Sequence, residues 1–320
     1  MSSIMTNVSA ISALQTLRNI NSDMENTQNR ISSGYKVDTA ADNAAYWSIA
    51  TTMRSDKAAM STVNDALGLA AAKTDTAYLG LDNSIQVLSE IKTKLVAARE
   101  PGVDKLKVNA EVDELKNQLK SISESASFSG QNWLYNTDAT ANATIEMVGS
   151  FNRSDTGAVS VGVLKFDTAD STLIDTNDVT LGLLTKDTLV TQPSGTTTAT
   201  ANYFLLDVDA ATPATGNEIT LTSATTNDDL DGMISAVDQM LTSMTDTAAT
   251  LGAANARIDM QNSFVSDLID TIGKGVGRLV DADMNEESTK LKALQTQQQL
   301  GIQSLSIANT DSQNILQLFR

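Results

Sequence analysis

The stretch GKGVGR at 273–278 holds the residues that come nearest to phosphate chemistry in this chain. Its three glycines and two cations are the residue types that cradle phosphate groups. Their spacing matches neither the phosphate-binding loop nor the dinucleotide-binding fingerprint, and no predicted strand precedes them. We therefore expect a glycine-softened joint between two helices at this point.

The absence of two residue types limits the catalytic mechanisms that this chain could use. The 320 residues include no Cys and no His. This excludes a disulfide framework and a thiol nucleophile, and it removes the most common general base and metal ligand. The carboxylates of the middle segment lack the spacing of a calcium loop or of a two-carboxylate active site. An active site built from Ser, Lys, Asp or Glu is the weaker alternative to a protein without catalytic activity. We therefore expect that the protein is not an enzyme and that it binds no cofactor and no metal.

The net charge of −17 is concentrated in the middle of the chain. Residues 137–231 hold 14 acidic and 3 basic residues, which gives that segment −11. Such a segment should repel nucleic acid and anionic lipid and suits a solvated surface. The first twenty residues lack the features of a secretory signal peptide, and no apolar run is long enough to span a membrane. By these rules the protein would be cytoplasmic.

The first third of the chain is helical by its periodicity. Apolar residues recur every three or four positions up to residue 31, which places them along one helix, and Gly34 is the expected end. The stripe consists of Ile4, Val8, Ile11, Leu14, Leu17, Ile20, Met24 and Ile31.

Sustained seven-residue repeats follow from about Asp42 and return near the C-terminus, which favours a coiled-coil-like bundle. Pro101 should end the first of these helices, and a shorter helix should return between Val108 and Ile122. The first repeat runs through Met60, Leu67, Thr74, Leu81, Leu88 and Leu95. The second runs through Leu230, Val237, Met244, Leu251, Ile258, Val265 and Ile272.

The chemistry changes between the helical arms. Residues 143–151 and 158–166 alternate apolar and polar side chains around a turn-like NRSDTG, which predicts a β-hairpin. Residues 202–209 and 217–223 suggest a second strand pair, and the low-complexity 191–201 suggests a loop.

The predicted fold is therefore mainly α: a long antiparallel helical bundle from both termini, with a β-hairpin and a small β-rich insert. The terminal helices have few large apolar residues, so they should be marginal alone and should need other copies of the chain. The expected parts, in chain order, are an N-terminal inner-core helix (1–33), outer-core helices (34–136), the β-hairpin with the outer insert (137–229), a further outer-core helix (230–276) and a C-terminal inner-core helix (277–320).

Three segments resemble the bacterial flagellins. NRISSGYKVDTAADNAAYWSIATTMRSD (29–56) is similar to their N-terminal region, while GRLVDADMNEES (277–288) and SQNILQLFR (312–320) are similar to their C-terminal region. The resemblance covers about 1–135 and 230–320, and Tyr46–Trp47 with TTMRSD is similar to flagellins of plant-associated alphaproteobacteria.

The resemblance implies a structural subunit that self-assembles into the flagellar filament used in swimming motility. It replaces the cytoplasmic expectation with an extracellular filament, reached through the flagellar type III pathway without a cleaved signal peptide. The implied partners are further flagellin subunits, the export apparatus and its chaperone, and the filament cap and hook-junction proteins. A hook–filament junction protein is the nearest alternative; a signalling coiled coil would need membrane spans.

The resemblance also directs the choice of site residues. The outer-core seam should comprise Leu67, Leu81, Leu88, Leu95, Leu230, Val237, Met244, Leu251, Ile258 and Val265. The assembly interface should comprise Ile11, Leu14, Leu17, Ile20, Met24, Leu305, Ile315, Leu316 and Phe319, although intramolecular core residues would have the same spacing.

Host innate immune receptors recognise two stretches in this family, and both depart from the usual pattern here. In 29–50, Ala41 stands where a Lys is usual and Asn43 where an Asp is usual. In 84–99, Ser89–Glu90 stands where Gln–Arg is usual. Because Glu90 reverses the charge offered to a partner, we expect weak recognition.

Overall fold

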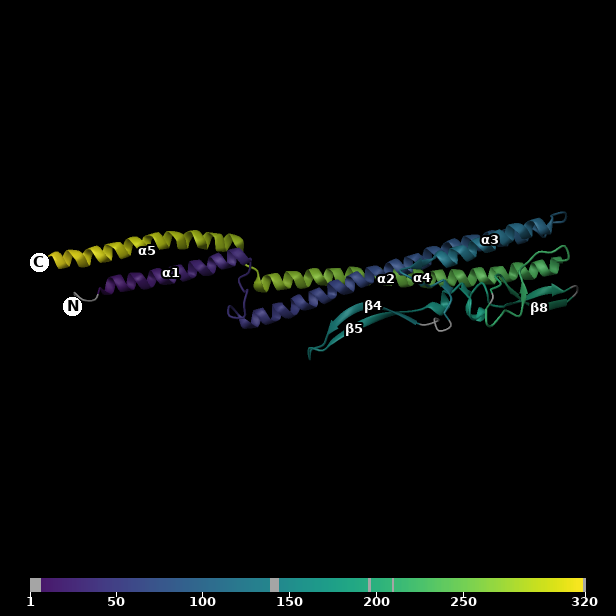
Figure 1. Ribbon diagram of the computed structural model, residues 1–320, viewed down its shortest axis with the longest axis horizontal. Coiled ribbons are helices and arrows are strands. Elements are labelled where there is room, and N and C mark those ends of the chain that lie inside the picture. Colours follow the sequence, from purple (N-terminus) through teal and green to yellow (C-terminus); the bar gives the residue numbers. More distant parts are fainter. Residues whose placement is uncertain (1–6, 139–143, 195–196, 209, 319–320) are drawn as a thin grey trace. The chain divides into compact units, whose positions relative to one another are not determined.

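The computed structural model describes residues 7–138, 144–194, 197–208 and 210–318 (Figure 1). Long helices dominate, as the sequence predicts, and short strands lie between α3 and α4. The helices are α1 (Val8–Ser33), α2 (Ala44–Ala97), α3 (Lys105–Ser125), α4 (Asn227–Val280) and α5 (Met284–Leu318). The chain forms two compact units, of which the first is Met1–Ala59 with Leu268–Arg320 and the second is Met60–Asp267. Both α2 and α4 contribute residues to each unit.

The helix ends follow from local sequence. The side chain of Asn7 caps α1 by accepting a 3.0 Å hydrogen bond from the Ala10 N–H. Gly34 ends the same helix with a φ of 81°, a left-handed conformation that glycine adopts without a Cβ penalty. Asp104 caps α3 through the Leu106 N–H. The predicted returning helix is therefore confirmed as α3.

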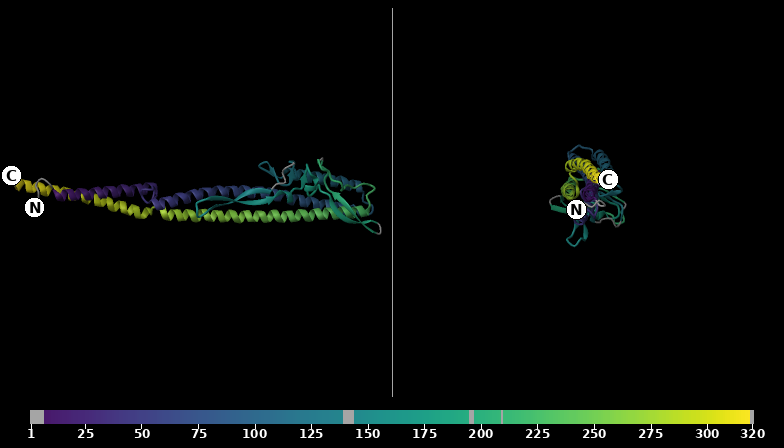
Figure 2. Two further views of the ribbon diagram at one scale, coloured as in Figure 1. Left: turned by 90° about the horizontal axis from the view of Figure 1, so that it is seen from below. Right: turned by 90° about the vertical axis from the view of Figure 1, so that its left-hand side faces the viewer.

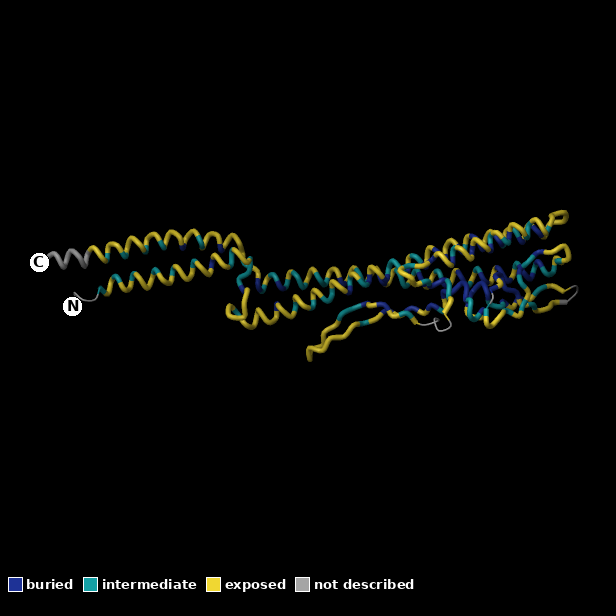
Figure 3. Tube along the Cα trace, in the orientation of Figure 1, coloured by how far each residue is buried: buried dark blue, intermediate teal, exposed yellow. Residues whose placement is uncertain are grey.

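The core of the second unit is built on the heptad repeats. All ten residues of the expected outer-core seam are between 0 % and 4 % exposed. Lys92 of α2 pairs with Asp238 of α4, and Arg99, in the turn that follows α2, pairs with Asp231 of α4. Lys94–Glu111 joins α2 to α3 in the same way. Figure 3 shows the buried positions gathered where these helices and the strands meet.

The strands of the second unit form small sheets. The predicted hairpin is confirmed: β4 pairs antiparallel with β5, with an irregularity between Val148 and Ser150. The strands are β1 (Ser127–Phe128), β2 (Gln131–Asn132), β3 (Tyr135–Asn136), β4 (Thr144–Arg153), β5 (Val159–Asp167), β6 (Ile174–Asp175), β7 (Thr188–Ser194), β8 (Thr197–Phe204) and β9 (Asn217–Glu218). Two single-turn 3₁₀ segments, Thr168–Asp170 and Val179–Leu181, lie among them.

Two expectations for the strands need correction. The predicted loop 191–201 is wrong for its described residues, because β7 and β8 pair antiparallel through most of it. Threonine is β-branched and favours strands, and this preference outweighs the low complexity of the segment. The expected strand pair at 202–209 and 217–223 is reduced to β8 and β9, which pair in parallel at two positions.

The expected interruption of the C-terminal helix at 273–278 is also wrong. Helix α4 runs unbroken to Val280, and the chain leaves the helix at 281–283 before α5 begins. The glycines are tolerated because a single Gly costs a helix only about 1 kcal/mol. Packing of the neighbouring Val276 and Val280, which are both buried, offsets that cost.

Candidate assembly surfaces

Helices α1 and α5 form an antiparallel pair within the first unit and lie side by side in both Figure 1 and Figure 2. Their facing positions alternate in steps of three and four, the spacing of a coiled-coil seam. Every seam residue is buried or half-buried. The seam comprises Ala10, Ala13, Leu17, Ile20, Met24, Thr27 and Ile31 of α1, and Glu287, Leu291, Leu294, Gln298, Gly301, Leu305 and Ala308 of α5.

Three polar contacts set the register of this pair along its length. The Asn7 side chain donates a 2.8 Å hydrogen bond to the Ala308 carbonyl. Gln298 donates to Asn21 at 2.7 Å. Arg30 pairs with the nearly buried Glu287 at 3.1 Å. Because these contacts join residues far apart in sequence, periodicity alone could not have identified them.

A small apolar core anchors the pair at the end where α1 and α4 finish. Val37, Ala50, Val276 and Val280 are buried together, with Tyr35 packed against them. The backbone of residues 34–37 hydrogen-bonds to Val280 and Ala282, which holds the turn between α4 and α5 in place. The Arg54 guanidinium lies 4.7 Å from the centre of the Tyr35 ring. This packing explains why the helix breaks at 281–283.

Ile11 and Leu14 point away from the seam, with exposed fractions of 57 % and 37 %. The reason is geometric. Each step of three residues covers about 300° around a helix, which is less than a full turn. A run of residues at this spacing therefore moves gradually away from one face of the helix. Val8, Ile11 and Leu14 belong to such a run. The alternating spacing of Ala10, Ala13 and Leu17 was the signal that sequence reasoning missed.

The remaining candidate interface residues are divided between the seam and the chain end. Leu17, Ile20, Met24 and Leu305 are half-buried between helices of the same chain. Ile315 and Leu316 belong to α5, but their side chains lie outside the described residues, as does Phe319 entirely. On the described part of the pair, large apolar side chains stay exposed. They are Val8, Ile11, Leu14, Met284, Leu300, Ile302 and Ile307.

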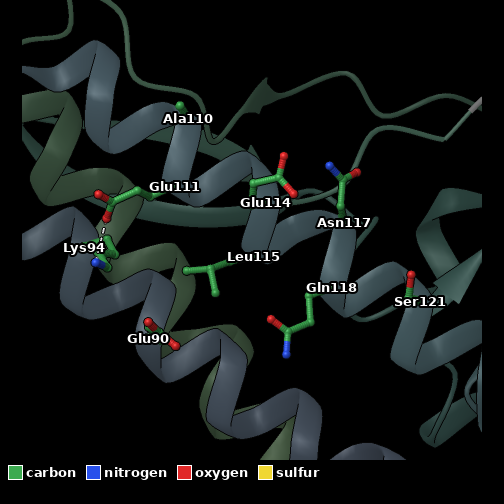
Figure 4. A pocket seen from close by; sticks show the side chains of 9 residues that line it. All are labelled: Glu90, Lys94, Ala110, Glu111, Glu114, Leu115, Asn117, Gln118 and Ser121. Atoms are coloured by element: carbon green, nitrogen blue, oxygen red, sulfur yellow. Dashed lines mark ion pairs between the residues drawn. The ribbon is translucent and has the colours of Figure 1, made fainter.

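A second candidate surface lies in the second unit, between α2 and α3. It is a groove of about 700 Å³, whose lining includes Glu114 of α3. Figure 4 shows Glu90 and Lys94 on α2 facing Glu111, Leu115 and Gln118 on α3. Lys94 pairs with Glu111 at 2.6 Å, and this hydrogen bond and the Glu111 charge raise the pKa of Lys94. Glu90 is exposed at the edge of this groove. The groove therefore presents excess negative charge.

The turn before α2 is held by one carboxylate. Asp42 accepts hydrogen bonds from the Thr39 N–H at 2.9 Å, the Thr39 hydroxyl at 3.0 Å and the Asp38 N–H at 3.1 Å. These bonds favour the ionised form, with Thr39 contributing most, and they hold the pKa of Asp42 below 3.8. The turn lies in the 29–50 segment.

Two other kinds of site were sought in the described ranges. Within them, no cluster of three or more Asp and Glu side chains is arranged to hold a metal ion. The helices of the described chain include none that is long and apolar enough to cross a bilayer.

Comparison with known proteins matches both helical ends. Residues 4–139 match the bacterial flagellin N-terminal helical region, and residues 234–319 match the bacterial flagellin C-terminal helical region. Similar proteins include Flagellin C of Rhizobium meliloti strain 1021 (63 % identical) and Flagellin A of the same strain (46 % identical). A flagellin of Brucella melitensis is 42 % identical, and all three alignments cover 100 % of both chains.

These relatives agree with the expected resemblance to flagellins of plant-associated alphaproteobacteria, and they favour a filament subunit over the hook–filament junction alternative. The helical seam, the exposed apolar stripe and the matches at both ends lead to one conclusion. The chain belongs to the bacterial flagellins, the structural proteins that polymerise into the extracellular flagellar filament.

Proposed function

We propose that the α1–α5 pair is the surface through which copies of this chain join in the filament. The supporting observation is the thin core of the pair. Of its seam residues, only Thr27, Glu287 and Leu294 are buried, and two of these are polar. A helix pair that buries so little apolar surface gains little stability by itself. Contact with other copies would supply the missing burial.

The seam and the exposed stripe have different roles in this proposal. Leu17, Ile20, Met24 and Leu305 hold α1 against α5, while Ile11 and Leu14 face neighbouring subunits. Ile315, Leu316 and Phe319 extend the contact at the end of the chain. This division follows from burial, because a side chain already covered within one chain has less apolar area to bury on assembly.

Seeded polymerisation of purified monomers tests the proposal. Full burial of an aliphatic side chain contributes about 1.5–3 kcal/mol. Ile11 has 57 % of its surface left to bury, so Ile11→Ser should cost assembly about 1–1.5 kcal/mol. This corresponds to a rise in critical concentration of roughly five- to twelvefold.

The matched control for this test is Leu189→Ser, because Leu189 is similarly exposed on β7 of the second unit. It should leave the critical concentration unchanged. A version lacking residues 311–320 should fail to elongate seeds. Normal filament growth by both the truncated chain and Ile11→Ser would refute the proposal.

We also propose that the chain leaves the cell through the flagellar type III pathway, without a cleaved signal peptide, escorted by its export chaperone. It would then add beneath the filament cap, beyond the hook-junction proteins. Family membership and the lack of Cys support this route, since a thiol-free chain cannot form wrong disulfides outside the cell. The intact mass of subunits from sheared filaments tests it: loss of an N-terminal segment would contradict the proposal.

Weak recognition by host innate immune receptors is the last part of the proposal. Glu90 lies at the edge of the acidic α2–α3 groove, whose lining also includes Glu111 and Glu114 (Figure 4). A receptor surface suited to a cation at this position would meet repulsion instead. The double variant Ser89→Gln/Glu90→Arg should raise the response of a receptor-reporter cell line. A strong response to the unmodified protein at low dose would contradict the expectation.

A further inference from the structure

The α1–α5 pair carries a groove along one flank. It has a volume of about 800 Å³, and the residues that line it carry no charge. Ser12 and Thr16 of α1 and Gly301 and Ser304 of α5 contribute small side chains to it. Val8 and Leu300, which also line the groove, are strongly exposed. The groove therefore fits an uncharged aliphatic occupant.

The opposite flank of the same pair carries a ridge, formed by Ile11, Leu14 and Ile302. At about 100° per residue, Leu14 lies roughly 160° around α1 from Thr16. Ile302 lies the same angle, about 160°, around α5 from Ser304. Ile302 is 54 % exposed, so all three ridge side chains have apolar area left to bury.

We infer that neighbouring subunits join by seating the ridge of one α1–α5 pair in the groove of the next. This inference rests on the proposed function of the pair as the assembly surface and adds which faces meet. The groove lining is uncharged and the three ridge side chains are aliphatic, so aliphatic side chains would enter a groove lined partly by small ones. Burial of the ridge and of Val8 and Leu300 would follow from a single kind of contact.

The geometry of this contact determines what kind of assembly it makes. If two grooves met each other, the contact would be symmetric, would close as a dimer and would leave both ridges exposed. A ridge-to-groove contact uses different faces of each copy, so every added subunit presents the next free face. Such a contact is open-ended, as a filament requires.

Cysteine cross-linking distinguishes these arrangements, because the chain has no Cys of its own. Thr16→Cys marks the groove and Leu14→Cys marks the ridge. Filaments are grown from each variant, from an equal mixture and from the double variant, then treated with a short bismaleimide and resolved on a denaturing gel. Single variants should stay monomeric. The mixture should give dimers at about one contact in four, and the double variant should give a ladder.

Two further arms keep the outcome decisive. Ile302→Cys replaces Leu14→Cys on the ridge if the latter assembles poorly, and Leu189→Cys on β7 serves as a control that should not cross-link to Thr16→Cys. Self-dimers of Thr16→Cys, or filaments in which neither ridge variant cross-links to the groove, would overturn the inference. Failure of the underlying proposal is recognised separately, by normal growth of the truncated chain and of Ile11→Ser.

Discussion

The ion pair between Lys116 of α3 and Glu218 of β9 should contribute strongly to the stability of the second unit. The Lys116 side chain is only 7 % exposed, and its Nζ lies 2.8 Å from Glu218 Oε1. Replacing Glu218 with Gln removes the negative charge and leaves a buried ammonium group. Breaking a fully buried pair costs about 3–5 kcal/mol. Glu218 is 37 % exposed, so we expect a smaller loss, about 2–3 kcal/mol.

A second Lys–Glu pair supplies the matched control. Lys165 and Glu146 face each other across β4 and β5 at 2.7 Å, but their side chains are 62 % and 53 % exposed. Because water screens an exposed pair, Glu146→Gln should cost no more than about 1 kcal/mol. The two variants remove the same charge at nearly the same distance and differ in burial.

Urea unfolding of dilute monomer measures both losses. Fluorescence of Trp133 suits the assay, because this residue is buried in the same unit. The double variant Lys116→Met/Glu218→Gln should recover much of the stability, since an apolar side chain tolerates burial without a partner. Equal losses for Glu218→Gln and Glu146→Gln would refute the reasoning, as would a double variant less stable than Glu218→Gln.

Further predictions concern α2 and the turn before it. At Gly80, an added Cβ would lie 2.7 Å from both Ala126 Cβ and Leu134 Cδ1, so Gly80→Ala should destabilise the protein by about 1–3 kcal/mol in thermal unfolding. Gly68→Ala, where no atom lies within 4 Å, should instead stabilise it by up to about 1 kcal/mol; the same sign for both would contradict the packing. The pKa of Asp42 is lowered from its ordinary value, so its contribution to stability is complete well above the ordinary pKa of a carboxyl group and is lost as the pH falls through the lower, folded-state pKa. Thr39→Val should move the pKa of Asp42 upward in a carboxyl ¹³C titration, and an unchanged pKa would show that the Thr39 hydroxyl does not stabilise the carboxylate.

Much of the architecture could be predicted from local pattern. The burial of Leu88 and Leu251 could be predicted from the seven-residue repeats to which they belong, because a helix brings every seventh side chain back to nearly the same face. The alternation in 143–166 predicted the hairpin for the equivalent reason, since side chains alternate between the faces of a strand. The lack of Cys and His narrowed the possible chemistry through composition alone.

Other features depended on contacts between distant residues. The end of α4 at Val280 is set by packing with Val37 and by backbone hydrogen bonds to residues 34–37, which overcome the weak helix propensity of the nearby glycines. The parallel pairing of β8 with β9 likewise joins segments whose local sequence suggests a simple hairpin.

The sequence by itself determined that both ends of this chain are amphipathic helices and that they resemble the ends of a flagellin. It could not separate the residues that hold α1 to α5 from those that face outward. An apolar side chain at helical spacing looks the same whether the surface that covers it comes from its own chain or from another. Tertiary structure divided Leu17 and Ile20 from Ile11 and Leu14, because only the partner helix determines which face of α1 is already covered.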